Sequence, residues 1–173
     1  MHSGRIVLFA LAAVTSLVMV GCTNSRGPTT EPSRAASGTA DFGGELSLTG
    51  YAIQDKNGHP EVELRWKALR KPSADYYVFV HVLDGSGEMV FQLDHPLKNP
   101  AGSVTGAWSA VESVIDRFLA APPPGRRTGT YTLRIGLYIA QPMKVLQVTG
   151  AAFRQPADGW KNQSILIERV DCK

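Results

Sequence analysis

Short runs of alternating apolar and polar residues, separated by glycine, proline and aspartate, make up most of the chain after residue 45. Residues 60–68 show the cleanest alternation, with Val62, Leu64 and Trp66 facing one way and charged side chains facing the other. A period of two residues is typical of a β-strand with one buried and one solvated face. We therefore expect a strand here, with Trp66 as a core anchor.

Residues 75–94 carry the strongest local signal, two apolar runs on either side of the turn sequence Asp84-Gly85-Ser86-Gly87. This pattern predicts a β-hairpin. If Asp84 pairs with Gly87, the register is fixed and one face of the hairpin is wholly apolar. The residues expected on this core face are Val78, Val80, Val82, Met89, Phe91 and Leu93.

The opposite face of the hairpin mixes aromatic with hydrogen-bonding side chains, as a shallow ligand platform or a half-buried polar network does. The residues expected on it are Tyr77, Phe79, His81, Val90, Gln92 and Asp94. His81 is interpreted either as a ligand-binding group or as a structural histidine bonded to a carboxylate such as Asp94 or Asp116. We favour the structural interpretation, because no second His or Cys lies at ligand spacing; His59 and His95 precede prolines in expected turns. No metal and no cofactor is expected.

A polar loop rich in proline and glycine, residues 96–106, leads to Trp108. This ring either plugs the edge of the fold or offers a flat stacking surface to a sugar, and plugging is favoured. Further strands are expected over residues 111–119, 129–140, 144–148 and 164–170. Since no segment of twelve or more residues has a helical period with caps, the sequence predicts an all-β antiparallel sandwich. It is expected to be immunoglobulin-like or Greek-key, with seven to eight strands.

The N-terminal residues 1–21 have the pattern of an export signal, with Arg5 followed by an apolar run too short for a comfortable membrane span. The run ends in Met19-Val20-Gly21-Cys22, which resembles the lipobox of bacterial lipoproteins. The resemblance implies cleavage before Cys22 and lipidation of its thiol, so that two or three acyl chains anchor the protein to a membrane. The alternative is an ordinary secretory signal, which would leave Cys22 free to form a disulfide with Cys172.

Residues 22–43 are dominated by Thr, Ser, Gly, Pro and Ala, which predicts a flexible tether. The sandwich domain is then expected over residues 44–173. Thr23 and Asn24 follow Cys22, and neither is the Asp that marks inner-membrane retention in enterobacterial lipoproteins. The resemblance therefore implies an exported protein, lipid-anchored to the cell envelope. If the source has an outer membrane, the protein is expected there, on the periplasmic or the surface face.

The chain of 173 residues is long enough for one domain with a substantial core. Its 18 Lys and Arg against 15 Asp and Glu give a net charge of only +3, without a clustered basic face. Nucleic acid is therefore not expected as a partner. The sequence leaves the oligomeric state open.

A wider pattern covers residues 62–138. Its parts are residues 77–84, Gly87, Gln92-Leu93-Asp94, Trp108, Val114-Ile115-Asp116, Gly129-Thr130-Tyr131 and Gly136-Leu137-Tyr138. It resembles small β-sandwich modules of uncharacterised bacterial exported proteins, which are also appended to some membrane glycosyltransferases. The usual acidic turn after Gly-Leu-Tyr is replaced here by residues 139–142. The resemblance implies that His81, Asp94, Trp108 and Asp116 belong to one shared pattern.

Three functions fit these features. We favour a non-catalytic envelope lipoprotein whose sandwich binds a glycan or an envelope protein through Tyr77, Phe79 or Trp108. The second is a structural or assembly lipoprotein whose sheet edges pair with a larger complex. The third and least favoured is a hydrolase built on Asp94 and Asp116, because no nucleophile motif is present and nothing in the sequence fixes the separation of these carboxylates.

Overall fold

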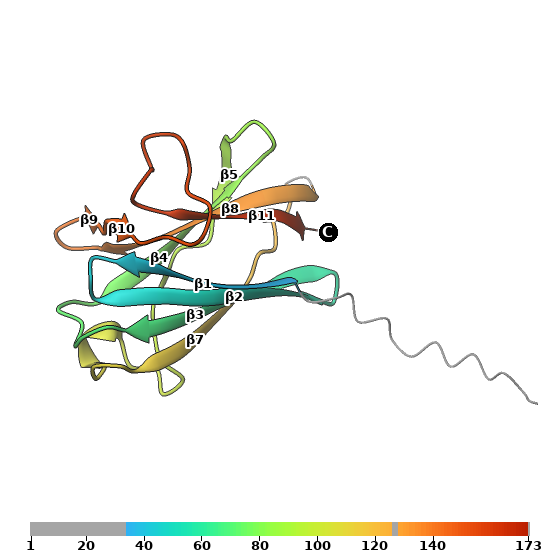
Figure 1. The fold of residues 1–173 in the computed structure, drawn as a ribbon. Helices are drawn as coiled ribbons and strands as arrows, with labels where there is room; N and C mark the ends of the chain where they lie inside the picture. The colour runs from blue at the N-terminus through green and yellow to red at the C-terminus, as the bar shows by residue number, and fades with distance from the viewer. Residues whose placement is uncertain (1–33, 126–127, 173) are drawn as a thin grey trace, which may run out of the picture.

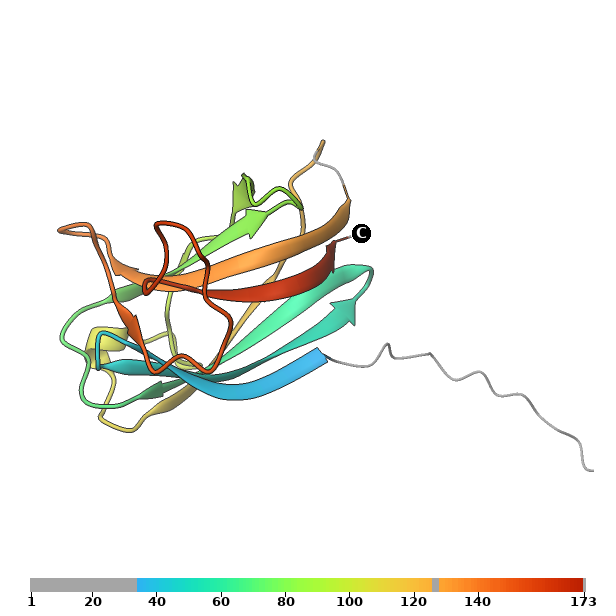
Figure 2. The same cartoon turned by 45° about the horizontal axis from the view of Figure 1, so that its top comes forward.

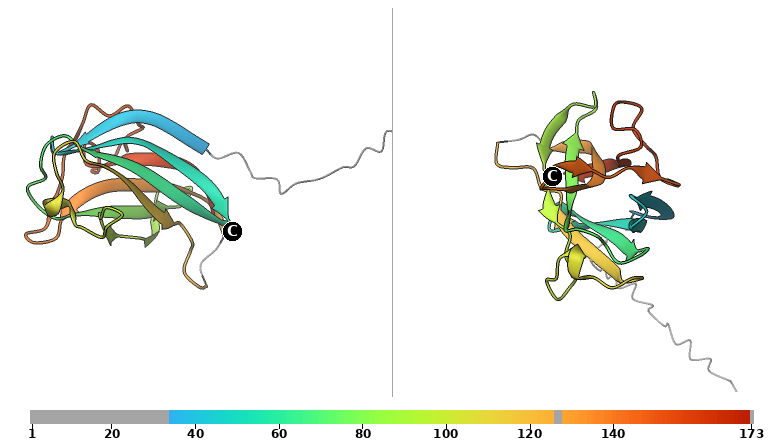
Figure 3. Two further views of the ribbon diagram at one scale, coloured as in Figure 1. Left: turned by 90° about the horizontal axis from the view of Figure 1, so that it is seen from below. Right: turned by 90° about the vertical axis from the view of Figure 1, so that its left-hand side faces the viewer.

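The computed structural model describes residues 34–125 and 128–172, which form two antiparallel β-sheets packed face to face (Figure 1). The first sheet consists of β1 (Arg34–Phe42), β2 (Leu46–Lys56), β3 (His59–Ala68), β7 (Ser113–Leu119) and β10 (Val148–Thr149). The second consists of β4 (Tyr76–Leu83), β5 (Met89–Gln92), β6 (His95–Pro96), β8 (Gly129–Ile139), β9 (Lys144–Val145) and β11 (Ile165–Cys172). The view along the strands separates the two layers (Figure 3, right).

The strand order is β10-β1-β2-β3-β7 in the first sheet and β11-β8-β4-β5 in the second, where β6 pairs with β4 and β9 with β8. The all-β sandwich expected from the sequence is confirmed. The described residues form eleven strands rather than seven or eight, but β6, β9 and β10 have only two residues each. This order matches that of immunoglobulin-like sandwiches. There, the neighbouring strands B and E of one sheet correspond to β3 and β7, and the order G-F-C-C′ of the other sheet corresponds to β11-β8-β4-β5. None of the described residues lies in a helix long and apolar enough to span a membrane.

Strand β1 lies inside the segment that the sequence assigned to the tether, so that boundary was wrong. It pairs with β2 from Arg34 opposite Ile53 to Phe42 opposite Leu46. Only Ala40 and Phe42 of this strand are buried, which is why its composition resembles a linker. Among the described residues, the sandwich therefore includes the chain from Arg34 onward. Residues 1–33, including the export signal, Cys22 and the first part of the expected tether, lie outside the described residues.

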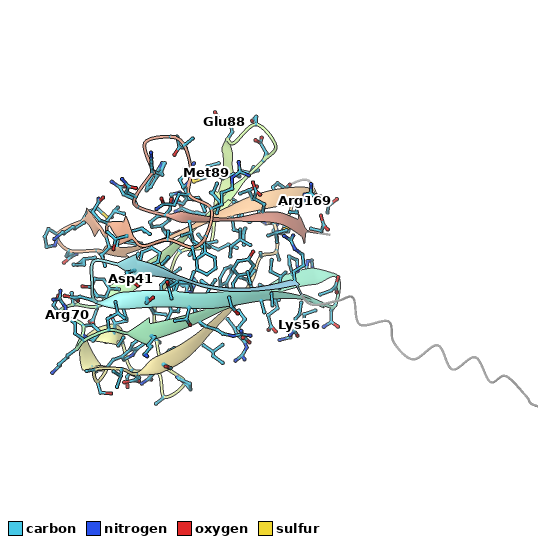
Figure 4. All side chains as sticks on the ribbon, viewed as in Figure 1. Asp41, Lys56, Arg70, Glu88, Met89 and Arg169 are labelled. Carbon is cyan, nitrogen blue, oxygen red and sulfur yellow. The ribbon has the colours of Figure 1, made fainter. Side chains whose placement is uncertain are left out.

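Arg34 fixes the start of β1 against the far end of β11. One of its guanidinium nitrogens donates hydrogen bonds to the carbonyl oxygens of Glu168 and Arg169, at 2.8 Å and 2.7 Å. These bonds join the first sheet to the second at the end of the sandwich where Lys56 lies. Arg70 marks the opposite end (Figure 4).

Side chains from both sheets fill the space between the layers (Figure 4). Trp66 is buried there, as the alternation on β3 predicts, and its ring meets Phe42 edge-on at 5.4 Å. The other large side chains that are fully buried include Trp108, Leu46, Leu48, Leu64, Leu97, Leu133, Ile135, Leu137, Ile165 and Ile167. This apolar burial is the main favourable term for the fold.

The β4–β5 hairpin has a wider turn than the sequence predicts. His81 pairs with Gln92, whereas pairing of Asp84 with Gly87 would place His81 opposite Val90. The Asp84 N–H donates to the carbonyl oxygen of Glu88 at 3.0 Å, and the Asp84 carboxylate accepts the N–H groups of Ser86 and Glu88.

A register shift of two residues leaves each side chain on the same face of the hairpin, so most of the residues expected on the core face do lie there. Val78, Val80, Val82 and Phe91 are buried. Leu93 is half-buried and packs against the core. Met89 lies beside a bulge at the hairpin tip and is 54% exposed, so only this residue was wrongly assigned to the core.

Candidate functional site

The outer face of the second sheet carries an open pocket of about 370 Å³, here called the aromatic pocket. It is lined by Phe79, His81, Gln92, Asp94, Tyr138, Met143, Val145 and Trp160. Strands β4, β5, β8 and β9 supply most of these residues, and Trp160 comes from the loop that joins β10 to β11 (Figure 2). The mixed face predicted for the hairpin therefore contributes four side chains to one concavity.

Phe79 forms the floor of the aromatic pocket, since its ring lies across β8 at Gly136. These two residues are opposite each other in the β4–β8 register. A Cβ atom at Gly136 would lie 2.2 Å from Cζ of Phe79, so only glycine leaves room for the ring. With 3% exposure, Phe79 is a packing residue, and it presents little surface to a ligand.

Trp160 covers Phe79 and His81 from the loop side, with ring centroids 5.4 Å and 5.2 Å away. Two other residues hold this loop in place. Arg134, buried on β8, donates to the Asp158 carboxylate at 2.5 Å, and its guanidinium carbon lies 5.5 Å from the centre of the Trp160 ring. The other Asp158 oxygen accepts a hydrogen bond from the backbone N–H of Trp160 at 3.0 Å. The wall of the aromatic pocket is thus pinned to the sheet.

His81 packs between rings rather than against Asp116. Its imidazole lies 4.9 Å from the Phe79 ring and edge-on to Trp160. Burial lowers its pKa; the negative charge of Asp94 opposes this effect and the positive charge of Arg134 adds to it. The neutral imidazole offers one donor and one acceptor to the aromatic pocket.

Tyr138 lines the aromatic pocket on the side of β8, whereas Tyr77 of β4 does not line it and packs against Tyr138. They are opposite each other in the sheet, and their rings stack with centroids 5.4 Å apart. Burial raises the pKa of Tyr138, and the neighbouring Asp94 and Tyr77 raise it further. The phenol therefore stays protonated near neutral pH and can donate a hydrogen bond.

Asp94 supplies the carboxylate of the aromatic pocket. Its Oδ1 accepts a hydrogen bond from the backbone N–H of Val80 at 3.1 Å, which holds the side chain beside β4. Within the described residues, no Lys, Arg or His nitrogen lies within ion-pair distance of this carboxylate.

Asp116 has a different environment. It is 8% exposed, and its Oδ2 lies 2.9 Å from Nε2 of His95, whose Nδ1 lies 2.9 Å from the carbonyl oxygen of Leu93. The pair joins β7 to β6 and so links the two sheets along one edge. Burial opposes protonation of His95, but the hydrogen bonds to Asp116 and Leu93 outweigh it and raise the pKa of His95.

Trp108 is a core residue, as the plugging interpretation expects. Its ring is 1% exposed, and its Nε1–H donates to the carbonyl oxygen of Ser103 at 3.0 Å. His81, Asp94, Trp108 and Asp116 therefore do not form one cluster. The structure brings only His81 and Asp94 to the same pocket.

Sequence reasoning did not assign Tyr138, Met143, Val145, Trp160 or His95 to a site. Tyr138 and Trp160 join the aromatic pocket through strand pairing and a long loop, which no local pattern reveals. His95 was set aside as a turn residue, although a signal for it existed. Asp116 is an acid on the inward face of a strand, between Val114 and Phe118, and such a group requires a buried partner.

In comparisons with protein-family models, curated proteins and solved structures, nothing matches this chain. Over residues 34–125 and 128–172, no group of three or more His, Cys, Asp or Glu side chains is placed to hold a metal ion. The geometry defines a class: an all-β sandwich with an open pocket of aromatic and hydrogen-bonding side chains on its outer face.

Proposed function

We propose that this protein is a membrane-anchored, non-catalytic envelope lipoprotein whose sandwich binds a glycan in the aromatic pocket. Support for the anchor comes from the lipobox resemblance at Cys22. Support for binding comes from the pocket. The single observation that carries the proposal is that Tyr138 and Trp160 border the same 370 Å³ space as Gln92 and Asp94.

A sugar ring has an apolar C–H face and a periphery of hydroxyl groups. Aromatic rings of Tyr and Trp can pack on the first, and amide, carboxylate and imidazole groups can bond the second. The volume of the aromatic pocket lies in the range of about 300 to 1,000 Å³ typical of small-molecule sites. Asp94 and Asp116 lie in separate environments, so the geometry favours binding over the paired-carboxylate hydrolysis considered from the sequence.

The position of the aromatic pocket suits a tethered protein. The chain enters the sandwich at Arg34, beside Glu168 and Arg169 of β11. Tyr138 lies at the other end of β8, whose first residues pair with the end of β11 (Figure 1). A protein anchored through Cys22 would therefore present this pocket on the half of the sandwich away from the membrane.

The test is a glycan array probed with the full-length chain in mild detergent, followed by Tyr138→Ala and Trp160→Ala. Each change should weaken binding of a retained glycan by about tenfold or more, as loss of an aromatic contact residue does. Tyr51→Ala is the matched control, because Tyr51 packs on Phe153 outside the aromatic pocket. Failure of every glycan to bind, or equal loss in the control, would refute the proposal. Phe79 and Trp108 are unsuitable targets because both are buried.

A second candidate function, an assembly lipoprotein, is favoured by strand β7. Within the described residues, β7 pairs only with β3 and so forms an edge of the first sheet. It exposes Ile115 and Leu119, at 44% and 45%, on its outer face. Exposed edge strands can add a strand from a partner. Changing Ile115 and Leu119 together to Lys should then abolish co-purification of an envelope protein, while Tyr138→Ala should leave it intact.

A further inference from the structure

The aromatic pocket contains a carboxylate, that of Asp94, which forms no ion pair within the described part of the chain. The Asp94 carboxylate is exposed and is held by the Val80 N–H through one oxygen. A fixed carboxylate in a concave site favours a cationic group on the ligand.

The neighbouring basic groups are committed elsewhere. His95 feels the charge of Asp94, but its Nε2 lies 2.9 Å from the Asp116 carboxylate and its ion pair is with that group. Arg134 bonds Asp158 and lies over the ring of Trp160. Lys144 lines a different cavity, of about 350 Å³, together with Glu45 and Arg70. His81 is neutral near pH 7 because burial lowers its pKa. The remaining polar groups of the aromatic pocket, Gln92 and the Tyr138 phenol, carry no charge.

The rings of the aromatic pocket would reinforce binding of a cation. The faces of Trp and Tyr attract ammonium groups through their quadrupoles, and the attraction grows as the group loses water. Trp160 and Tyr138 border the same space as Asp94, and the negative charge of Asp94 is felt at Tyr138. Carboxylate and ring faces thus converge on one volume.

We propose that the ligand is an amino sugar with a free, protonated amine, held by Asp94 through its ammonium group and by Trp160 and Tyr138 through its ring. This inference rests on the proposed glycan-binding function and specifies its substrate class. A sugar is preferred to a lysine side chain because Gln92, His81 and the Tyr138 phenol offer neutral donors and acceptors that hydroxyl groups would use. A lysine side chain has no polar group besides its ammonium, so once that group is bound to Asp94 it offers them no hydroxyl groups.

The experiment compares two oligosaccharides by calorimetry on the full-length chain in detergent: a tetramer of glucosamine and a tetramer of N-acetylglucosamine. The first should bind at least about tenfold more tightly, because acetylation removes the charge-assisted bond to Asp94. Asp94→Asn should abolish the preference, and Asp94→Glu, which keeps the charge, should retain it. Asp75→Asn is the matched control, since Asp75 is also exposed and also accepts one backbone N–H, from Gly106, outside the aromatic pocket.

Three outcomes would overturn the inference. Equal or tighter binding of the acetylated tetramer, unaffected by Asp94→Asn but lost in Tyr138→Ala, would refute the amine and leave the glycan-binding function standing. Absence of binding by either tetramer and by every other glycan would refute both. Displacement of the glucosamine tetramer by an equal concentration of Nα-acetyl-lysine amide would show that the amine alone is recognised, which refutes the sugar.

Discussion

Replacing Gly136 with alanine tests how tightly the floor of the aromatic pocket is built. The added Cβ would lie 2.2 Å from Cζ of Phe79 and 2.6 Å from the carbonyl oxygen of Gln163. Neither neighbour can move freely. The Phe79 ring is buried beneath Trp160, and the Gln163 oxygen is a backbone atom whose residue also bonds the Trp160 carbonyl through its N–H.

Overpacking of a filled site costs about 1 to 3 kcal/mol of unfolding free energy. We expect Gly136→Ala to lower the unfolding free energy by about 3 kcal/mol, because two separate contacts must be relieved at once. For a domain of this size that corresponds to a loss of about 10 °C in Tm. Urea unfolding followed by tryptophan fluorescence measures the change directly.

Gly129→Ala provides the matched control on the same strand. A Cβ there would meet only a ring carbon of Tyr131, at 4.0 Å, and the expected cost is within about 0.5 kcal/mol. Combining Phe79→Leu with Gly136→Ala should recover only part of the stability, since the contact with the Gln163 oxygen remains. Equal stability of the two alanine variants would show that the ring and the loop are not packed over Gly136 as described.

Three further predictions concern other parts of the chain. Burial opposes protonation of His95, but its bonds to Asp116 and Leu93 raise its pKa above the ordinary 6.5. The protonated His95 should therefore stabilise the fold fully below pH 6.5, and this stabilisation should disappear as the pH rises through the raised pKa. His95→Gln should therefore flatten this decline in urea midpoints. Burial raises the pKa of the Cys172 thiol to about 11, so iodoacetamide at about pH 8 should label it, by mass spectrometry, only after unfolding. Cys22→Ser should move the protein from the membrane to the soluble fraction; unchanged membrane association would contradict the lipid anchor.

Strands β3, β4 and β8 could be predicted because their alternation of apolar and polar residues follows from the backbone geometry of a strand. The burial of Trp66 follows from the same alternation. Strand β1 could not be predicted this way, since its small and polar residues form a strand by pairing with β2. The hairpin register depends on how the Asp84 carboxylate captures two N–H groups, which the turn composition does not specify.

The candidate site was only half predictable for a related reason. His81 and Asp94 belong to the hairpin, so its pattern placed them on one face. Tyr138 reaches the aromatic pocket through pairing of β4 with β8, and Trp160 through a loop held by Arg134 and Asp158. Such long-range contacts are properties of the assembled sheets.

The pairing of β1 has a mechanical consequence. A pull applied at Arg34, directed away from the aromatic pocket, acts along the axis of β1, and the hydrogen bonds to β2 lie across that axis. They are loaded together in shear, whereas a pull at right angles to the strand would peel them apart one by one. The two bonds from Arg34 to β11 share the first part of that load. Tension between a membrane anchor and a bound ligand would therefore load the sheet in the direction in which its hydrogen bonds resist separation most.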